Sequence, residues 1–282
     1  MKLINTFMTG MLMLALSTGS VSAQDSDSAR KYHPFLSENF HIGLGVYRPA
    51  KKTTLGGNTN IASGAAGSLE GSDDQSTGSL NFRWRFTKNW HFQTTYWATD
   101  SSTQQTLTED FTFNPGGPDE TVFQAGSFVG MGVDTTIARL FWGRSFFRKP
   151  NHDWGVGLGL HWLEIDAFVE GNAVIGGGPN EFRRESASAS VPLPNLGIWY
   201  MWSWSPNWVL ASRFDWLEVT VDEFSGSMYD VSVGVNYQMS KHFGMGFAVN
   251  GFVLDVDFKG DNAEVGLKNE QIGPRLNVTW NW

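Results

Sequence analysis

The chain ends in the stretch Ile272-Gly273-Pro274-Arg275-Leu276-Asn277-Val278-Thr279-Trp280-Asn281-Trp282. Even-numbered positions carry the apolar and aromatic side chains, and odd-numbered positions carry glycine or polar side chains. Successive side chains of a strand point to opposite faces, so this period of two predicts a strand with one apolar and one polar face. A strand of this kind suits a wall between lipid and a polar lumen.

The same alternation recurs along most of the chain. It predicts ten strands, at residues 40–47, 79–86, 90–99, about 135–146, 154–169, about 190–204, 208–221, 227–239, 243–258 and 265–282. Short connections alternate with long ones. The short ones, 87–89, 148–153, 205–207 and 240–242, are each followed by an aromatic residue, and most tryptophans lie near them or near the C-terminus. The long ones, 48–78, 100–134 and 170–189, are rich in Gly, Ser, Asn and Asp, and 222–226 and 259–264 are shorter members of this set.

This arrangement predicts an all-β fold, a transmembrane antiparallel up-and-down β-barrel. Short turns would lie in the periplasm within an aromatic girdle, and long loops would lie outside the cell. Residues 1–23 have the pattern of a secretory signal peptide, with a basic start, an apolar run and small residues before Gln24. We therefore expect a periplasmic N-terminal segment at 24–39 and a single barrel domain at 40–282. The chain has no cysteine, and its formal net charge of −8 argues against a nucleic-acid partner.

The Trp-ended last strand and the repeated turn-then-aromatic units resemble those of bacterial outer-membrane β-barrel proteins. This resemblance covers the segment after residue 23 and concerns architecture rather than an activity. It implies residence in the bacterial outer membrane among its lipids. It also implies insertion by the outer-membrane assembly machinery, which recognises the C-terminal aromatic strand.

In several strands, the apolar residues shift by one position, from one face of the strand to the other. This happens near Trp162, Trp216 and Gly251, and in another strand near Pro194. A β-bulge at each place would keep the apolar side chains facing lipid throughout. With these bulges, a network of ion pairs is expected to fill the lumen. Its predicted members are Arg83, Arg85, Arg139, Arg213, Arg275, Glu164, Asp166, Asp215, Glu218, Asp230, Asp255 and Asp257.

Three functions are compatible with this lumen. A filled, ion-paired lumen indicates a structural or surface-interaction protein, which could bind an extracellular ligand through its long loops. An acidic outer mouth over a wet path would instead give a narrow cation-preferring channel. An enzyme is disfavoured, because His91 and His161 have no serine at a defined offset. Omptin proteases are also ten-stranded and use acids and histidines at the outer rim, but a second rim histidine is missing here. No pattern indicates a cofactor or a metal site.

Overall fold

The computed structural model describes residues 32–58, 62–63, 68–71, 76–113, 120–221, 224–260 and 263–282. The predicted signal peptide and the first part of the predicted N-terminal segment lie outside these residues. The described part contains one short helix, α2 (Pro34–Ser37), and otherwise strands and their connections. No helix among these residues is both long enough and apolar enough to span a membrane.

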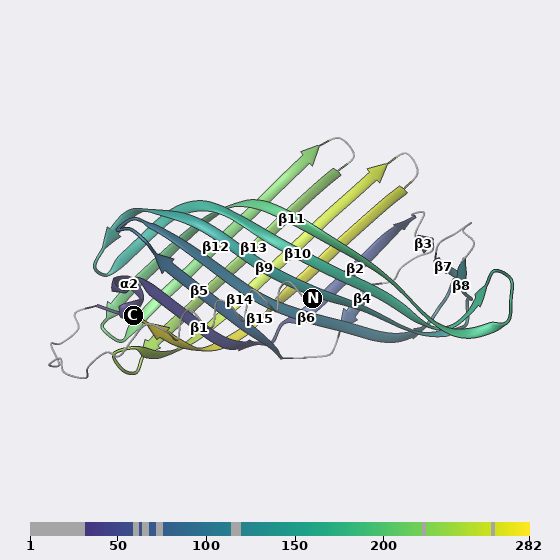
Figure 1. Cartoon of the computed structure of the whole chain (residues 1–282), viewed down its shortest axis with the longest axis horizontal. Helices are drawn as coiled ribbons and strands as arrows, with labels where there is room; N and C mark the ends of the chain where they lie inside the picture. Colours follow the sequence, from purple (N-terminus) through teal and green to yellow (C-terminus); the bar gives the residue numbers. More distant parts are fainter. Residues whose placement is uncertain are drawn as a thin grey trace. The chain divides into compact units, whose positions relative to one another are not determined.

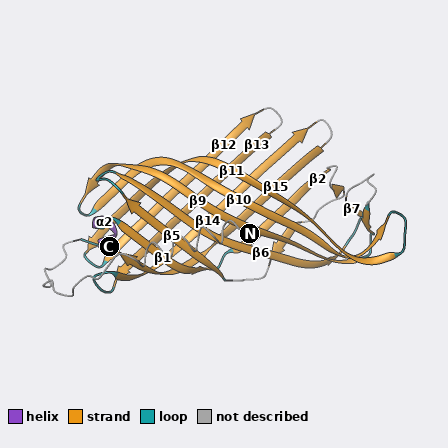
Figure 2. Ribbon diagram, in the orientation of Figure 1, coloured by secondary structure: helices purple, strands orange, loops and turns teal. Residues whose placement is uncertain are grey.

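Ten strands form a closed ring by antiparallel pairing of neighbours. They are β1 (Phe40–Tyr47), β5 (Thr77–Arg85), β6 (Trp90–Thr106), β9 (Phe128–Lys149), β10 (His152–Ile175), β11 (Asn180–Ser205), β12 (Trp208–Val221), β13 (Phe224–Gln238), β14 (Phe243–Gly260) and β15 (Ala263–Asn281). The last strand pairs with the first, with Ile42 opposite Trp280. Figures 1 and 2 show the strands running obliquely past one another. The predicted ten-stranded antiparallel barrel is confirmed.

The predicted long loops contain more strand than expected. Residues 170–189 form the outer ends of β10 and β11, which are paired as far as Val174 and Asn180. The connection after β1 contains β2 (Ala50–Asn58), β3 (Ala62–Ser63) and β4 (Ser68–Gly71), and that after β6 contains β7 (Phe111–Phe113) and β8 (Thr121–Phe123). In Figure 1, β9, β10 and β11 continue together as a long curved ribbon. We call the end of the barrel that carries this ribbon the long-strand end. The opposite end, which carries turns such as 87–89 and 205–207, is called the short-turn end.

The outer surface carries an apolar band that begins at the short-turn end. Leu276 and Val278 of the terminal strand are 61% and 55% exposed on this surface, as the alternation predicts. The tryptophans beside the short turns are also exposed there, namely Trp84, Trp90, Trp154, Trp202, Trp204, Trp208 and Trp280. Exposed apolar and aromatic side chains at this density are typical of a lipid-facing wall and its girdle.

The predicted bulges near Trp162, Pro194, Trp216 and Gly251 are absent, because each of these residues lies in at least one strand pairing whose register continues past it without a shift. Register shifts occur elsewhere, at Trp154/Gly155 and Ser203/Ser205. Along each of these strands, side chains therefore continue to alternate between the inside and the outside. What changes is that the apolar residues take the inward positions and the polar residues take the outward ones. Beyond Trp162, Leu163 and Ile165 are buried inside the barrel, whereas Glu164 and Asp166 face outward. Apolar side chains turn inward where the surroundings outside change from lipid to water.

Pairing between β11 and β12 ends at Leu196 and Trp216, although both strands continue outward. Ser203 donates its backbone N–H to Asn151, on the β10 side. N–H groups alternate in direction along a strand, so those of even-numbered β11 residues point toward β12. Pro192 and Pro194 are the next even positions beyond the last paired ones, and proline has no N–H to donate. Two successive missing donors explain why the β11–β12 seam opens there.

Candidate functional site: the lumen

The helix α2 lies in the lumen at the short-turn end, where Phe35 and Leu36 are buried. Pro34 at its first position favours helical backbone, and the His33 side chain accepts a hydrogen bond from the Phe35 N–H at 3.0 Å. Arginines of the wall bind its carbonyl oxygens. Arg83 donates to Phe35, and Arg85 donates to Leu36 at 2.7 Å. The helix is therefore tied to the inner wall as a plug.

Apolar and aromatic contacts complete this plug layer. Phe35 and Leu36 pack with Phe141, Trp199, Met201 and Val209. The Arg83 guanidinium lies 4.2 Å from the centre of the Phe35 ring, which is cation–π geometry. Arg85 also pairs with Asp153 at 2.7 Å, and both side chains are almost completely buried.

A charged layer crosses the middle of the lumen. Arg139 of β9 donates to both carboxylate oxygens of Asp215 on β12, and both side chains are fully buried. Arg213 donates to both oxygens of Asp230 at 2.7 Å. These contacts join three strands, and bidentate arginine–carboxylate pairs are among the strongest hydrogen-bonded contacts in proteins.

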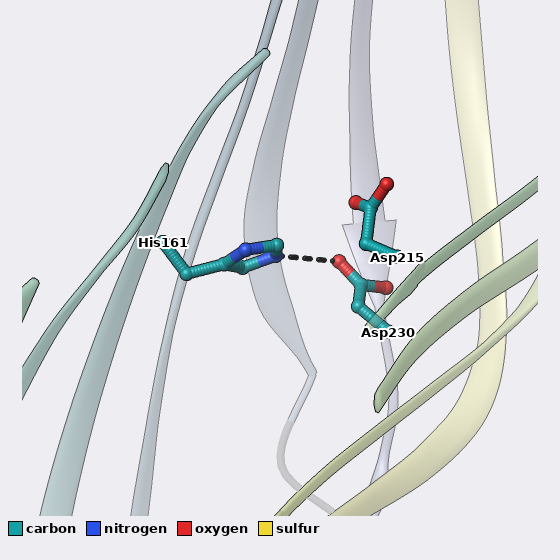
Figure 3. Close-up of side chains that lie close together, drawn as sticks. All are labelled: His161, Asp215 and Asp230. Atoms are coloured by element: carbon teal, nitrogen blue, oxygen red, sulfur yellow. Dashed lines mark hydrogen bonds and ion pairs between the residues drawn. The ribbon is translucent and has the colours of Figure 1, made fainter. Parts of the chain in front are cut away.

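His161 extends this layer from β10. Its Nε2 lies 3.0 Å from Asp230 Oδ2, and its Nδ1 lies 2.7 Å from the amide nitrogen of Asn195. With the amide nitrogen of Asn195 as a donor, Nδ1 of His161 accepts a hydrogen bond and Nε2 donates one to the Asp230 carboxylate. Figure 3 shows His161 pointing toward Asp230, with Asp215 beside it.

Two glycines leave the space for this layer. A Cβ at Gly159 would lie 2.3 Å from Asn195 Oδ1, and one at Gly197 would lie 2.1 Å from Asp215 Oδ1. Both distances are far below van der Waals contact. Larger residues at these positions would displace the buried amide or carboxylate.

His161, Asp215 and Asp230 place one potential ligand atom each within 4.8 Å of one another, which raises the question of a metal ion. The carboxylate oxygens that a cation would need are bound by Arg139 and Arg213. Two arginines beside the group would also repel a cation. The donor set fits an ion-pair network rather than a metal centre.

An apolar layer fills the lumen toward the long-strand end. Its buried side chains come from most strands of the ring and include Tyr47, Trp97, Ile137, Leu163, Leu193, Met228, Phe252 and Leu254. It continues outward through Val129, Met131, Val133, Ile165 and Val169. Plug, charged layer and apolar layer therefore follow one another along the lumen.

Comparison with solved structures identifies the architecture. The outer membrane protease OmpT from Escherichia coli matches with a TM-score of 0.54 at 12% sequence identity, over 91% of this chain and 100% of that one. The chain has the fold of an outer-membrane β-barrel. The toluene transporter TodX from Pseudomonas putida matches at 8% identity over 88% and 91% of the two chains, with a TM-score of 0.38. The attachment invasion locus protein Ail from Yersinia pestis matches at 12% identity over 84% and 99%, with a TM-score of 0.25. No protein-family model and no curated protein matches the chain.

The barrel lumen brings together only some of the side chains predicted to form its ion-pair network. Those that lie inside are Arg83, Arg85, Arg139, Arg213, Arg275, Asp215 and Asp230. Five predicted members, Glu164, Asp166, Glu218, Asp255 and Asp257, instead lie on the outward face. Their placement was wrong because it depended on the absent bulges.

The lumenal arginines also differ in their partners. Arg275 donates to the amide oxygen of Asn81 at 3.2 Å, and Arg83 binds a backbone carbonyl and the Met201 sulfur. Among the described residues, neither arginine forms an ion pair with a carboxylate, so the pairing predicted for them is corrected. Asp153, Asn195 and the plug were not predicted as parts of the lumen. The inward parity of Asp153 in its strand was a usable signal, whereas the position of α2 depends on tertiary packing.

Neither of the two histidines considered as catalytic bases, His91 and His161, has the environment of one. Both ring nitrogens of His161 are engaged, and the His91 ring packs edge-on against Trp199 at 4.4 Å. In the described part of the chain, no serine or threonine hydroxyl is hydrogen-bonded to either one. The nucleophile–base pair that hydrolytic catalysis by serine or threonine needs is therefore not formed by these histidines.

Proposed function

We propose that this protein resides in the bacterial outer membrane as a sealed barrel that conducts no ions. It would act as a structural or surface-interaction protein. One observation carries this proposal: three different layers fill the lumen in succession, namely the α2 plug, the Arg–Asp layer and the apolar layer. A conducting path needs continuous water, which an apolar layer of fully buried side chains does not provide.

The two alternative functions have less support. The alternative of a cation-preferring channel depends on an acidic outer mouth, but Glu164, Asp166 and Glu218 face outward, so they do not line the lumen. OmpT is a protease, yet the likeness to it concerns the fold alone. The engagement of both His161 nitrogens gives a hydrolytic role no base. We therefore propose that the chain is not an enzyme.

The interaction surface would be the long-strand end. The outer part of β11 is exposed on both faces, including Phe182 at 69% exposure and Val191 at 39%. Beyond Leu196 its edge is also unpaired with β12. An extracellular ligand would meet this ribbon and the connections around it. For insertion, we propose that the assembly machinery recognises the C-terminal strand.

Planar-bilayer recording tests the sealed barrel. Purified full-length protein should give no conductance steps, under conditions where a general porin gives clear ones. A variant lacking residues 32–38 should also remain silent, because the charged and apolar layers are still present. Reproducible steps from the wild-type protein would overturn the proposal. The channel alternative would gain support if Arg139→Met changed the cation preference of those steps.

A further inference from the structure

Among the described residues, the inner half of the lumen holds more positive than negative charge. Five of their arginines project into it, and these face three aspartates, Asp153, Asp215 and Asp230. Arginine stays protonated in proteins, so this excess cannot be removed by loss of a proton. Buried charge without compensation is costly.

The two arginines without a carboxylate partner differ in what surrounds their charge. Arg83 contacts the Phe35 carbonyl, the Met201 sulfur and the face of the Phe35 ring. Arg275 has one described hydrogen bond, from Nη1 to Asn81, and no ring face beside it, while the buried Nε of both arginines has no partner among the described residues. Arg275 is therefore the less compensated of the two.

A cavity of about 80 Å³ lies beside Arg275. Its polar lining includes Arg213, Arg275, Asn81, Asn236, Asn277 and Gln93. Small residues leave room here, since a Cβ at Gly246 would lie 2.8 Å from the amide nitrogen of Asn277 and 2.3 Å from Asn236 Oδ1. The cavity thus joins two guanidinium groups with carboxamides that can supply N–H donors.

We propose that this cavity binds a small inorganic anion of the halide class, most simply chloride, beside the Arg275 guanidinium. An anion there would compensate the least compensated arginine, and carboxamide N–H groups of the lining could donate to it. The cavity is several times larger than the roughly 10–15 Å³ that one water needs, so it has room for a halide together with water. The inference does not rest on the sealed-barrel proposal, because an anion can bind in a lumen that conducts or one that does not.

Thermal unfolding of the full-length protein in detergent tests this site. Protein refolded in sodium chloride or sodium bromide is compared with protein refolded in sodium gluconate at the same ionic strength, since gluconate is too large for the cavity. A ligand bound to the native state raises the unfolding midpoint with the logarithm of its concentration. We expect a saturable, halide-dependent increase for the wild-type protein. Arg275→Gln should abolish this dependence.

Two further variants make the result decisive. Arg183→Gln removes an exposed arginine at the long-strand end and should keep the full halide dependence. Asn277→Leu fills the cavity and keeps Arg275, so it should lose the dependence and serves if Arg275→Gln does not fold. A bromide anomalous-scattering peak beside Arg275 would locate the ion. A wild-type midpoint that is equal in chloride and gluconate would overturn the proposal, as would an undiminished halide dependence in both lumenal variants.

Discussion

Arg139 binds both carboxylate oxygens of Asp215, with neither side chain exposed to solvent. The pair bridges β9 and β12 across the barrel, between strands that are not neighbours in the ring. Such a contact stabilises the barrel against deformation only while both partners are present, because each one alone is a buried charge.

Replacing Arg139 with Met should therefore destabilise the protein strongly. Asp215 would keep only Arg213, whose Nε lies 3.8 Å away. We expect a loss of about 3–5 kcal/mol in the free energy of unfolding, measured by urea unfolding in lipid vesicles. Arg183→Met is the control, since its pairing with Glu181 is exposed and should contribute about 0–1 kcal/mol. A loss below about 1 kcal/mol for Arg139→Met would show that water screens the charged layer.

Removing Pro192 and Pro194 should extend the pairing between β11 and β12. The double variant Pro192→Ser, Pro194→Ser restores two N–H donors directed at β12. Continuing the register of Leu196 opposite Trp216 would place residues 193 and 219 across from each other. The chain has no native cysteine, so Leu193→Cys with Val219→Cys can report this pairing by disulfide formation. We expect a faster disulfide in the double-serine background than with the prolines.

A control pair belongs to the same experiment. Met201 and Ala211 are already opposite each other, so cysteines there should cross-link equally in both backgrounds. If the 193–219 disulfide forms equally fast with and without the prolines, the missing donors are not the cause of the open seam.

The orientation of the barrel remains a prediction. With the long-strand end outside, protease added to intact cells should cut within Lys51 to Ser76 or Asp110 to Glu120. The turn between β9 and β10, around Pro150 and Asn151, should be protected, because it would lie in the periplasm. Cleavage at that turn in intact cells would contradict the orientation, and lysed cells provide the positive control.

Loss of Trp282 should impair assembly. Its backbone exchanges two hydrogen bonds with Phe40, of 2.9 and 3.1 Å, and its ring stacks on the Phe40 ring at 5.3 Å. Deletion removes these ring-closing contacts together with the proposed recognition signal. We expect loss of the heat-modifiable, membrane-inserted form on gels, whereas Trp282→Phe should retain it. Normal insertion of the deleted protein would exclude this role.

Strand positions could be predicted because alternation is a local property of the chain. The strands Phe40–Tyr47 and Trp208–Val221 have the predicted bounds, and the others extend farther outward than predicted, while their bounds at the short-turn end differ by three residues or fewer. The lumenal positions of Arg139, Asp215 and Asp230 were also predictable. In their strands these residues lie on the face that carries glycines and polar residues, opposite the face that carries the apolar band. Their partners were less predictable, because pairing across the lumen joins residues that are distant in sequence.

By itself the sequence determined the ten-stranded architecture and the apolar outer band. It did not determine which face is inward beyond the band. Alternation defines two faces, but the solvent on each side decides which of them is buried. Leu163 and Glu164 take opposite sides from those first expected, because beyond Trp162 the apolar face is buried inside the barrel. Likewise only the tertiary structure placed α2 in the lumen, since its carbonyl groups are bound by arginines from distant strands.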